Sequence, residues 1–173
     1  MEFSRKWAMP SSNTFDIKPI HDFVYRYVHD GLFSVDPFAN MNRIASVTND
    51  LDPDYDTNYN MDALDFLKTF NKESVDLVLF APPYSSRQVS ECYKKMGMTV
   101  NMETTQGSFW RKLKDEVNRI TAVNGYVLCF GWNSNGMGLK RMYELKEILI
   151  VAHGGAHNDT ICTAERKLTS SLF

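Results

Sequence analysis

The chain has 173 residues, of which 43% are hydrophobic, and a formal net charge of -2. That length suits one domain with a continuous core, and the charge excludes a basic surface over the whole molecule, so contact with nucleic acid requires a local cluster. No apolar run approaches the roughly 18 residues of a membrane span, and the start lacks the apolar segment of a secretory signal. We expect one cytoplasmic domain over residues 1–173, without membrane contact and with residues 1–12 flexible.

The three cysteines are far apart in the sequence and show no spacing typical of metal sites. Cys92, Cys129 and Cys162 cannot all pair with one another, which predicts free thiols in a reducing compartment.

The first half of the chain predicts one helix followed by short strands. Apolar residues recur at helical spacing over residues 20–28, which indicates an amphipathic helix that begins near Pro19 and ends at Gly31. Short strands are predicted over residues 32–35 and 44–48.

The middle of the chain has a stronger pattern. Asp62 is predicted to open a short helix, and the continuous apolar run over residues 75–80 is typical of a fully buried parallel strand. Residues 109–120 place apolar side chains on one helical face, and a turn at residues 124–125 leads into a strand over residues 126–130.

Residues 147–152 and 160–166 are two strand-like segments, and together they predict a closing β-hairpin at a sheet edge. Gly154 and Gly155 in the connecting loop supply positive φ angles. Strands that alternate with helices indicate an α/β fold with a mostly parallel sheet and helices on both faces.

Four polar segments follow the predicted strands and helix, at residues 36–40, 49–50, 62–63 and 81–84. In an open α/β sheet, ligands bind beyond the carboxyl ends of the strands. Carboxylates there can accept hydrogen bonds from ribose hydroxyls or an exocyclic amine. A single acidic loop residue is more often a helix cap or a solvated charge, but the ordered series favours a nucleoside site.

The sharpest signal is Pro82-Pro83-Tyr84. Consecutive prolines after a buried strand stiffen the backbone and leave carbonyl oxygens as acceptors, while the tyrosine ring can stack on a base removed from its duplex. In isolation, this sequence would instead indicate a rigid turn with a packed tyrosine.

In this context the motif resembles that of the amino methyltransferases that modify N6 of adenine or N4 of cytosine in DNA. The resemblance covers roughly residues 13 to 167. It implies a Rossmann-like class I methyltransferase fold with a mostly parallel seven-stranded sheet, a terminal antiparallel hairpin and S-adenosylmethionine as cofactor. It also implies a reaction centre at Ala81, Pro82, Pro83 and Tyr84.

The same resemblance implies a cofactor site. Asp36-Pro37-Phe38 looks like the start of the family's cofactor loop, Asp50 like the acidic residue that holds the ribose, and Asp62 like the one that contacts adenine. Residues 13–20 are similar to a segment that closes over the methionine end. The implied cofactor-binding residues are Thr14, Phe15, Asp36, Pro37, Phe38, Ala39, Asn40, Asp50, Leu51, Asp62, Ala63 and Phe80.

The chain departs from the family pattern at three points. Asn40 and Asn42 stand where the cofactor loop has glycines, although asparagine tolerates positive φ better than most residues. No separate target-recognition domain is visible. Ala81 replaces the Asp, Asn or Ser that accepts a hydrogen bond from the target amine, which predicts weakened catalysis.

Substrate contacts are predicted beside the reaction centre. Tyr84 can stack on the target base, Arg87, Lys94 and Lys95 can contact phosphates, and Gln88 can read a base edge. The alternative for these charges is a solvated helix face. His153 and His157 are interpreted as turn residues, with no metal site.

We therefore expect S-adenosylmethionine-dependent methyl transfer to N6 of adenine in DNA, weakened by Ala81, by a chain that can form a homodimer. Two alternatives remain open. One is a catalytically silent relative that binds the cofactor or nucleic acid. The other is methylation of another amine, in cytosine, RNA or a nucleotide.

Overall fold

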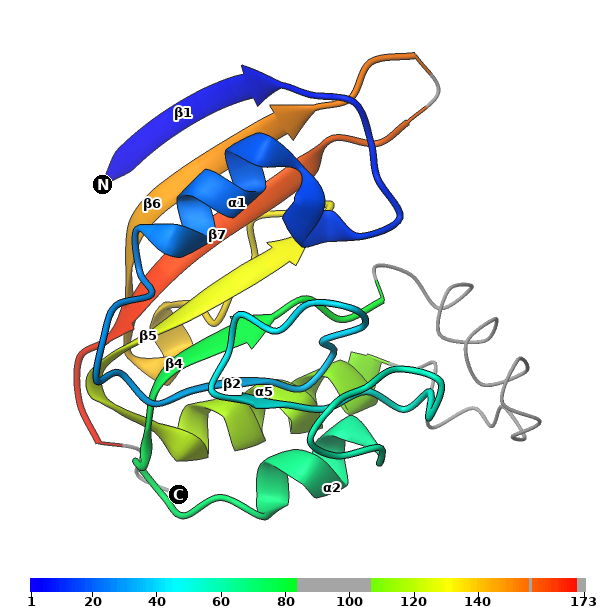
Figure 1. Cartoon of the computed structure of the whole chain (residues 1–173). Helices are drawn as coiled ribbons and strands as arrows, with labels where there is room; N and C mark the ends of the chain where they lie inside the picture. The colour runs from blue at the N-terminus through cyan, green and yellow to red at the C-terminus, as the bar shows by residue number, and fades with distance from the viewer. Residues whose placement is uncertain (84–106, 156, 171–173) are drawn as a thin grey trace.

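The structure is a computed structural model that describes residues 1–83, 107–155 and 157–170 (Figure 1). Its centre is a seven-stranded sheet in the order β1-β6-β7-β5-β4-β2-β3. Strand β7 is antiparallel to both of its neighbours, and the other pairs are parallel. The strands are β1 (Glu2–Trp7), β2 (Ser34–Asp36), β3 (Val47–Thr48), β4 (Val75–Phe80), β5 (Thr121–Gly131), β6 (Tyr143–Ala152) and β7 (Thr160–Lys167).

Helices pack on both faces of the sheet (Figure 1), as the sequence predicted. Helix α1 lies on one face, and α2 and α5 lie on the other. Within the described residues, no helix combines the length and apolar content needed to cross a membrane. The helical elements are η1 (Thr14–Asp16), α1 (Lys18–Tyr25), α2 (Ala63–Lys68), α5 (Gly107–Ile120) and η2 (Leu139–Arg141).

Strand β4 separates two hydrophobic cores and is buried, as its apolar residues predicted, except at the exposed Asp76, which interrupts the predicted apolar run. Leu77 and Leu79 belong to the core under α1, whereas Val78 and Phe80 belong to the core under α2 and α5. Because side chains alternate between the faces of a strand, Ala81 comes next on the α1 side, where it packs against the first core.

The expectation that residues 1–12 are flexible is wrong for Glu2–Trp7. These residues form β1, which pairs in parallel with β6 from Glu147 to Ala152. The β6–β7 hairpin is confirmed, but it does not form the edge of the sheet, since β1 lies outside β6. The loop glycines have positive φ as expected, 69° at Gly154 and 58° at Gly155.

Two predicted elements are shorter than expected. Helix α1 ends at Tyr25, because the following amides donate to the carbonyl three residues earlier instead of four. Tyr27 N, for example, donates to Val24 O at 2.9 Å. The strand expected over residues 44–48 is reduced to β3, because the Ser46 amide donates to the Ser34 hydroxyl at 2.9 Å instead of to a ladder carbonyl.

Strand β5 is longer than predicted, and residues 124–125 lie inside it. Asn124 has φ 67°, and the β4–β5 register shifts between Val75 and Leu77. A Cβ at Gly125 would lie 2.9 Å from the carbonyl oxygens of Ala122 and Asp76, so glycine is required there. The predicted turn is therefore an irregularity in a strand that begins directly after α5.

Candidate functional site

Strands β2, β3 and β4 are parallel neighbours, so their carboxyl ends meet at one edge of the sheet. The three polar segments predicted after these strands, at residues 36–40, 49–50 and 81–83, consequently lie at this edge. The segment that carries η1 crosses the same side of the sheet near the end of β5 (Figure 1). The structure thus places the main predicted segments around one side of the molecule.

Asp36 organises the loop that follows β2. Its side chain is fully buried, and Oδ1 accepts the Phe38 amide at 2.9 Å while Oδ2 accepts Asn42 Nδ2 at 2.9 Å. The same Asn42 nitrogen donates to Ala39 O at 2.8 Å. Asn42, which stands where the resemblance implies a glycine, therefore points inward and holds the loop in place.

Burial raises the pKa of Asp36 to about 7, although the Asn42 and Phe38 donors oppose the shift, and the Asp50 charge adds to it. Desolvation disfavours the ionised form of a buried carboxyl. Asp36 is therefore a buried group that titrates near neutral pH directly beneath the predicted cofactor loop.

Asn40 adopts a left-handed backbone conformation that is usual for glycine, the residue that the resemblance implies at this position. Its φ is 51°, and its amide donates to Asp50 Oδ2 at 2.9 Å. The other oxygen of Asp50 accepts the Asp52 amide at 3.0 Å. The Asp50 carboxyl is partly exposed, and burial raises its pKa. Asp50 therefore joins the loop after β2 to the loop after β3.

Asn49 is a structural residue of the site to which the sequence assigned no role of its own. It is fully buried, and its Nδ2 donates to Pro37 O at 3.2 Å and Met61 O at 3.0 Å, while Oδ1 accepts the Met61 amide at 3.1 Å. Its position at the end of a predicted strand was the available signal. Asn49 holds three segments of the site together.

Asp62 caps α2, as the sequence predicted. Its Oδ1 accepts the Leu64 amide at 2.9 Å, which satisfies one of the free donors of the first helical turn. Ala63 begins the helix and is buried. The cap orients the Asp62 carboxyl at the start of α2, where the helix dipole favours negative charge.

Aromatic pairs brace the edge on both faces of the sheet. Phe38 meets Phe80 at the end of β4, with ring centroids 5.8 Å apart and the planes at 71°. Phe15 in η1 meets Phe130 at the end of β5, at 4.9 Å and 78°. Phe15 and Phe80 are buried, so both rings support the site from within.

The predicted cofactor residues fall into two groups by exposure. The side chains of one group are buried, so these residues contribute backbone groups and shape. The second group is partly exposed and can contact a ligand directly. The buried residues are Phe15, Asp36, Pro37, Ala39, Ala63 and Phe80, and the partly exposed ones are Thr14, Phe38, Asn40, Asp50, Leu51 and Asp62.

Of the predicted reaction centre, the structure describes Ala81, Pro82 and Pro83, which directly follow β4. Pro82 is buried, and Ala81 and Pro83 are partly exposed. Tyr84 and the predicted substrate contacts Arg87, Gln88, Lys94 and Lys95 lie outside the described residues. Their roles remain predictions.

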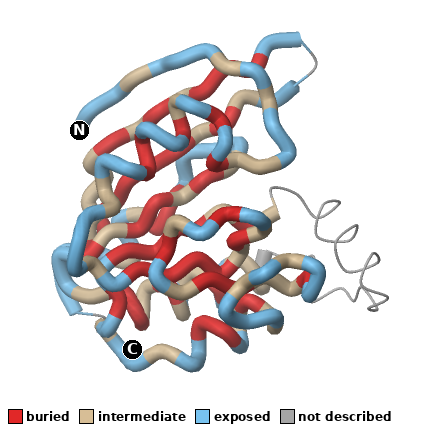
Figure 2. The backbone as a smooth tube through the Cα atoms, in the orientation of Figure 1, coloured by how far each residue is buried: buried red, intermediate tan, exposed pale blue. Residues whose placement is uncertain are grey.

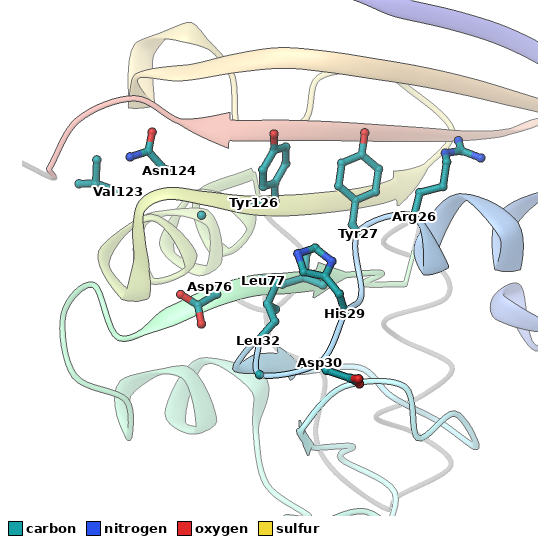
Figure 3. Close-up of a pocket in the computed structure, with 12 residues that line it drawn as sticks. Arg26, Tyr27, His29, Asp30, Leu32, Asp76, Leu77, Val123, Asn124 and Tyr126 are labelled. Carbon is teal, nitrogen blue, oxygen red and sulfur yellow. The ribbon is translucent and has the colours of Figure 1, made fainter.

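A cavity of about 650 Å³ lies at the opposite edge of the sheet (Figure 3). It lies near the amino end of β4, where Asp76 and Leu77 line it, and Tyr27, His29 and Tyr126 face it from neighbouring segments. None of its lining residues belongs to the predicted site. The cavity and the cluster of polar segments are therefore separate places in the molecule.

His153 has a structural role at the end of β6. Its Nδ1 lies 2.9 Å from Ala8 O, and its Nε2 lies 2.8 Å from Thr160 Oγ1. The ring is buried and links the ends of β1 and β7 to β6. Since both nitrogens have hydrogen-bond partners, the ring serves the packing of the hairpin.

No described protein family matches the chain, and no curated protein is similar to it. Solved structures do match. The match to the 1,6-didemethyltoxoflavin-N1-methyltransferase of Burkholderia thailandensis covers 88% of this chain and 78% of that protein, at a TM-score of 0.60 and 9% identity. That protein was solved with bound S-adenosylhomocysteine. This chain has the fold of class I S-adenosylmethionine-dependent methyltransferases.

Two further structures support the same fold. Over 88% of this chain, the TM-score to TrmN of Thermus thermophilus is 0.56 at 15% identity, and the chain spans 49% of TrmN. N-methyltransferase NodS of Bradyrhizobium japonicum gives a TM-score of 0.53 at 12% identity, with 92% of this chain and 100% of NodS covered.

The described side of the site fits an adenosyl cofactor in its chemistry. The partly exposed Asp50 carboxyl has about four acceptor positions, and it can accept ribose hydroxyls in addition to the amides of Asn40 and Asp52. Asn40 keeps the positive φ that the loop needs. Asp62 presents a second carboxyl nearby in the chain, at the start of α2.

Proposed function

We propose that this protein transfers a methyl group from S-adenosylmethionine to the exocyclic N6 of adenine in DNA, and that Ala81 lowers its rate. The observation that carries the proposal is the place of Ala81-Pro82-Pro83. This segment directly follows β4 and lies at the same sheet edge as the loop built on Asp36 and Asp50. The proposed cofactor site and the proposed amine-binding motif would thereby share one edge.

Three groups would hold the cofactor: Asp50 at the ribose, Asp62 at the adenine and the backbone of residues 37–40 beneath it. The bound cofactor supplies an electrophilic methyl group. The chain's own contribution is to orient the target amine, and the Pro82 carbonyl accepts a hydrogen bond from one amine hydrogen. Predicted stacking by Tyr84 would hold the base.

Ala81 lacks the acceptor for the second amine hydrogen. A hydrogen bond to a charged group is worth about 1.5 to 3 kcal/mol, which corresponds to about 10- to 150-fold in rate. Ala81 is partly exposed and lies on the α1 side of the sheet. An aspartate there would restore the acceptor at the position where the family has one.

The test is a methylation assay on Ala81→Asp beside the unchanged chain, with duplex DNA that contains or lacks adenine. We expect the substitution to raise N6-methyladenine formation about 10- to 150-fold. Ala81→Leu is the matched control, because it adds volume without an acceptor and should not raise the rate. Equal activity of Ala81→Asp and the unchanged chain would refute the role of this position.

A second candidate function is a catalytically silent relative that binds the cofactor or nucleic acid, and Ala81 itself favours it. Cofactor binding by Ala81→Asp without methylation of any adenine DNA would support this alternative. The same assay with RNA, nucleotides and cytosine-containing DNA tests the other amine acceptors. DNA as the partner rests on the predicted contacts of Arg87, Gln88, Lys94 and Lys95.

A further inference from the structure

Strand β1 is an ordered edge strand with an open outer side. All six of its residues pair in register with β6, and β1 stands at the end of the strand order (Figure 1). No other strand in the described part of the chain pairs with it. The outward amide and carbonyl groups of Glu2–Trp7 therefore form a template that another extended chain can join.

The residues of β1 are also exposed, apart from the half-buried Ser4 (Figure 2). Phe3 is 60% exposed and Trp7 is 65% exposed, although both are large and apolar. The strand is nevertheless fixed at its carboxyl end, because the Ala8 amide donates to Ala152 O at 3.1 Å and His153 Nδ1 lies 2.9 Å from Ala8 O. An anchored strand thus exposes both its faces and its outer backbone.

The sequence of β1 is complementary to itself when two copies run in opposite directions. In an antiparallel pair of two β1 strands with Ser4 opposite Ser4, Glu2 lies opposite Lys6 at both ends. These residues share one face of the strand, and directly opposed side chains are within contact distance. On the other face, Phe3 lies opposite Arg5, which favours a cation–π contact.

The charges that take part in this pairing are available. Glu2, Arg5 and Lys6 are exposed, and none of them makes an ion pair with another described residue. Charged side chains on an edge strand usually prevent association. Here the acidic residue stands near one end of the strand and Lys6 near the other, so that one antiparallel register brings opposite charges together, and that register is symmetric about Ser4.

We propose that β1 pairs antiparallel with β1 of a second copy of this chain, so that the two sheets join into one across a two-fold axis. A two-fold axis through the two Ser4 residues closes the assembly as a dimer. The strand has six residues, so the interface is small and the dimer depends on concentration. This inference is independent of the proposed methyl transfer.

The test is a charge-reversal series measured by analytical ultracentrifugation up to about 1 mM protein, which is the weak limit of specific association. Glu2→Lys and Lys6→Glu each turn two attractive pairs of the dimer into repulsive ones. We expect each single variant to raise the dimer dissociation constant about 10-fold or more, and the double variant Glu2→Lys/Lys6→Glu to restore it. Lys112→Glu on α5, on the far side of the sheet, is the charge-matched control.

A monomer at every concentration would overturn the proposal, and so would single variants that dimerise as well as the unchanged chain or a double variant that is not restored. A cross-linking experiment supports the series without relying on charge. With a short bis-maleimide, Ser4→Cys should give covalent dimers above the level of the unchanged chain. Ser74→Cys, an exposed serine in the loop before β4, should not, and equal yields from the two variants would also refute the pairing.

Discussion

Asp36 shows how a buried residue can shape a candidate binding site without exposing its side chain to a ligand. The sequence placed it among the cofactor contacts, whereas its buried carboxyl accepts hydrogen bonds from Phe38 and Asn42 within the same loop. A buried polar group must find its partners inside the protein. In the proposed function, Asp36 would therefore act on the cofactor only through the shape of the loop that it holds.

The pKa of Asp36, raised by burial to about 7, predicts a dependence of stability on pH. In the unfolded chain this carboxyl returns to the ordinary aspartate pKa of 3.8 and releases the proton that the folded state still holds. Stability therefore falls as pH rises between these two values. From pH 5 to pH 8 the loss is about 2 to 3 kcal/mol.

Urea unfolding of the unchanged chain and of Asp36→Asn at pH 5 and pH 8 measures this dependence. The unchanged chain should lose about 2 to 3 kcal/mol more than the variant over the interval, because groups common to both cancel in the comparison. An identical pH dependence of the two proteins would contradict a neutral-pH titration of Asp36.

Asn40 carries the second residue-scale prediction. The φ of Asn40 is 51°, a left-handed backbone conformation. This conformation is sterically unfavourable for alanine because of its Cβ, whereas glycine has no Cβ and adopts it freely. Asn40→Ala should lower the free energy of unfolding by about 1 kcal/mol, and Asn40→Gly should change it by less than about 0.5 kcal/mol. Thermal or urea unfolding of the two variants measures this difference. Equal losses of stability would mean that the backbone conformation is not the reason why asparagine stands at this position.

At the scale of elements, Lys167 joins the end of β7 to the junction of α5 and β5. Its side chain is fully buried, and Nζ donates to Asn118 O and Thr121 O, each at 2.7 Å, and lies 3.5 Å from Glu73 Oε1. Burial lowers the pKa of this ammonium, and Glu73 opposes the shift. The lysine thus satisfies carbonyls where a helix passes directly into a strand.

Lys167→Met keeps the length of the side chain but leaves those carbonyls without this donor. We expect the free energy of unfolding to fall by about 2 to 4 kcal/mol, because buried polar groups that lose a charged partner are costly. Lys140→Met in η2 is the control, since Lys140 is exposed and should change stability by less than about 0.5 kcal/mol. A loss below about 1 kcal/mol for Lys167→Met would show that the network is not needed.

The elements that the sequence predicted well are those whose pattern reflects burial. Strand β4 is apolar and buried on both faces from Leu77 to Phe80, and α5 has one apolar face. Strand β1 has no such pattern, because its side chains are exposed on both faces and backbone pairing with β6 holds it in place. Register with a distant strand cannot be inferred from local alternation.

For the molecule as a whole, the sequence correctly predicted that polar segments gather at the carboxyl ends of parallel strands. Parallel strands bring their carboxyl ends to one edge, so the segments after β2, β3 and β4 had to gather there. The bonds that build the site were not predictable in the same way. Asn49 joins Pro37 and Met61, each 12 residues away, and such contacts depend on how the loops fold over the sheet.

The position of the site relative to the sheet gives the last prediction. Within the described residues, two places are candidates for ligand binding: the carboxyl edge with Asp50, and the cavity at the amino edge lined by His29. If the carboxyl edge holds the cofactor, Asp50→Ala should weaken binding of S-adenosylhomocysteine about 10-fold or more, since an acceptor to the ribose is lost together with the clamp on Asn40. His29→Ala, at an exposed position of the other edge, should bind as the unchanged chain does.

Isothermal titration calorimetry with S-adenosylhomocysteine compares the three proteins without any need for turnover. The reverse result, in which His29→Ala weakens binding and Asp50→Ala does not, would indicate that the cofactor binds at the amino edge. Binding by none of them would remove the cofactor and leave a methyltransferase fold used for another purpose. Because a ligand that binds only the folded state stabilises it by an amount that rises with the logarithm of ligand concentration over Kd, a matching order of the ligand-induced shifts in thermal midpoint would tie the calorimetry to the folded domain.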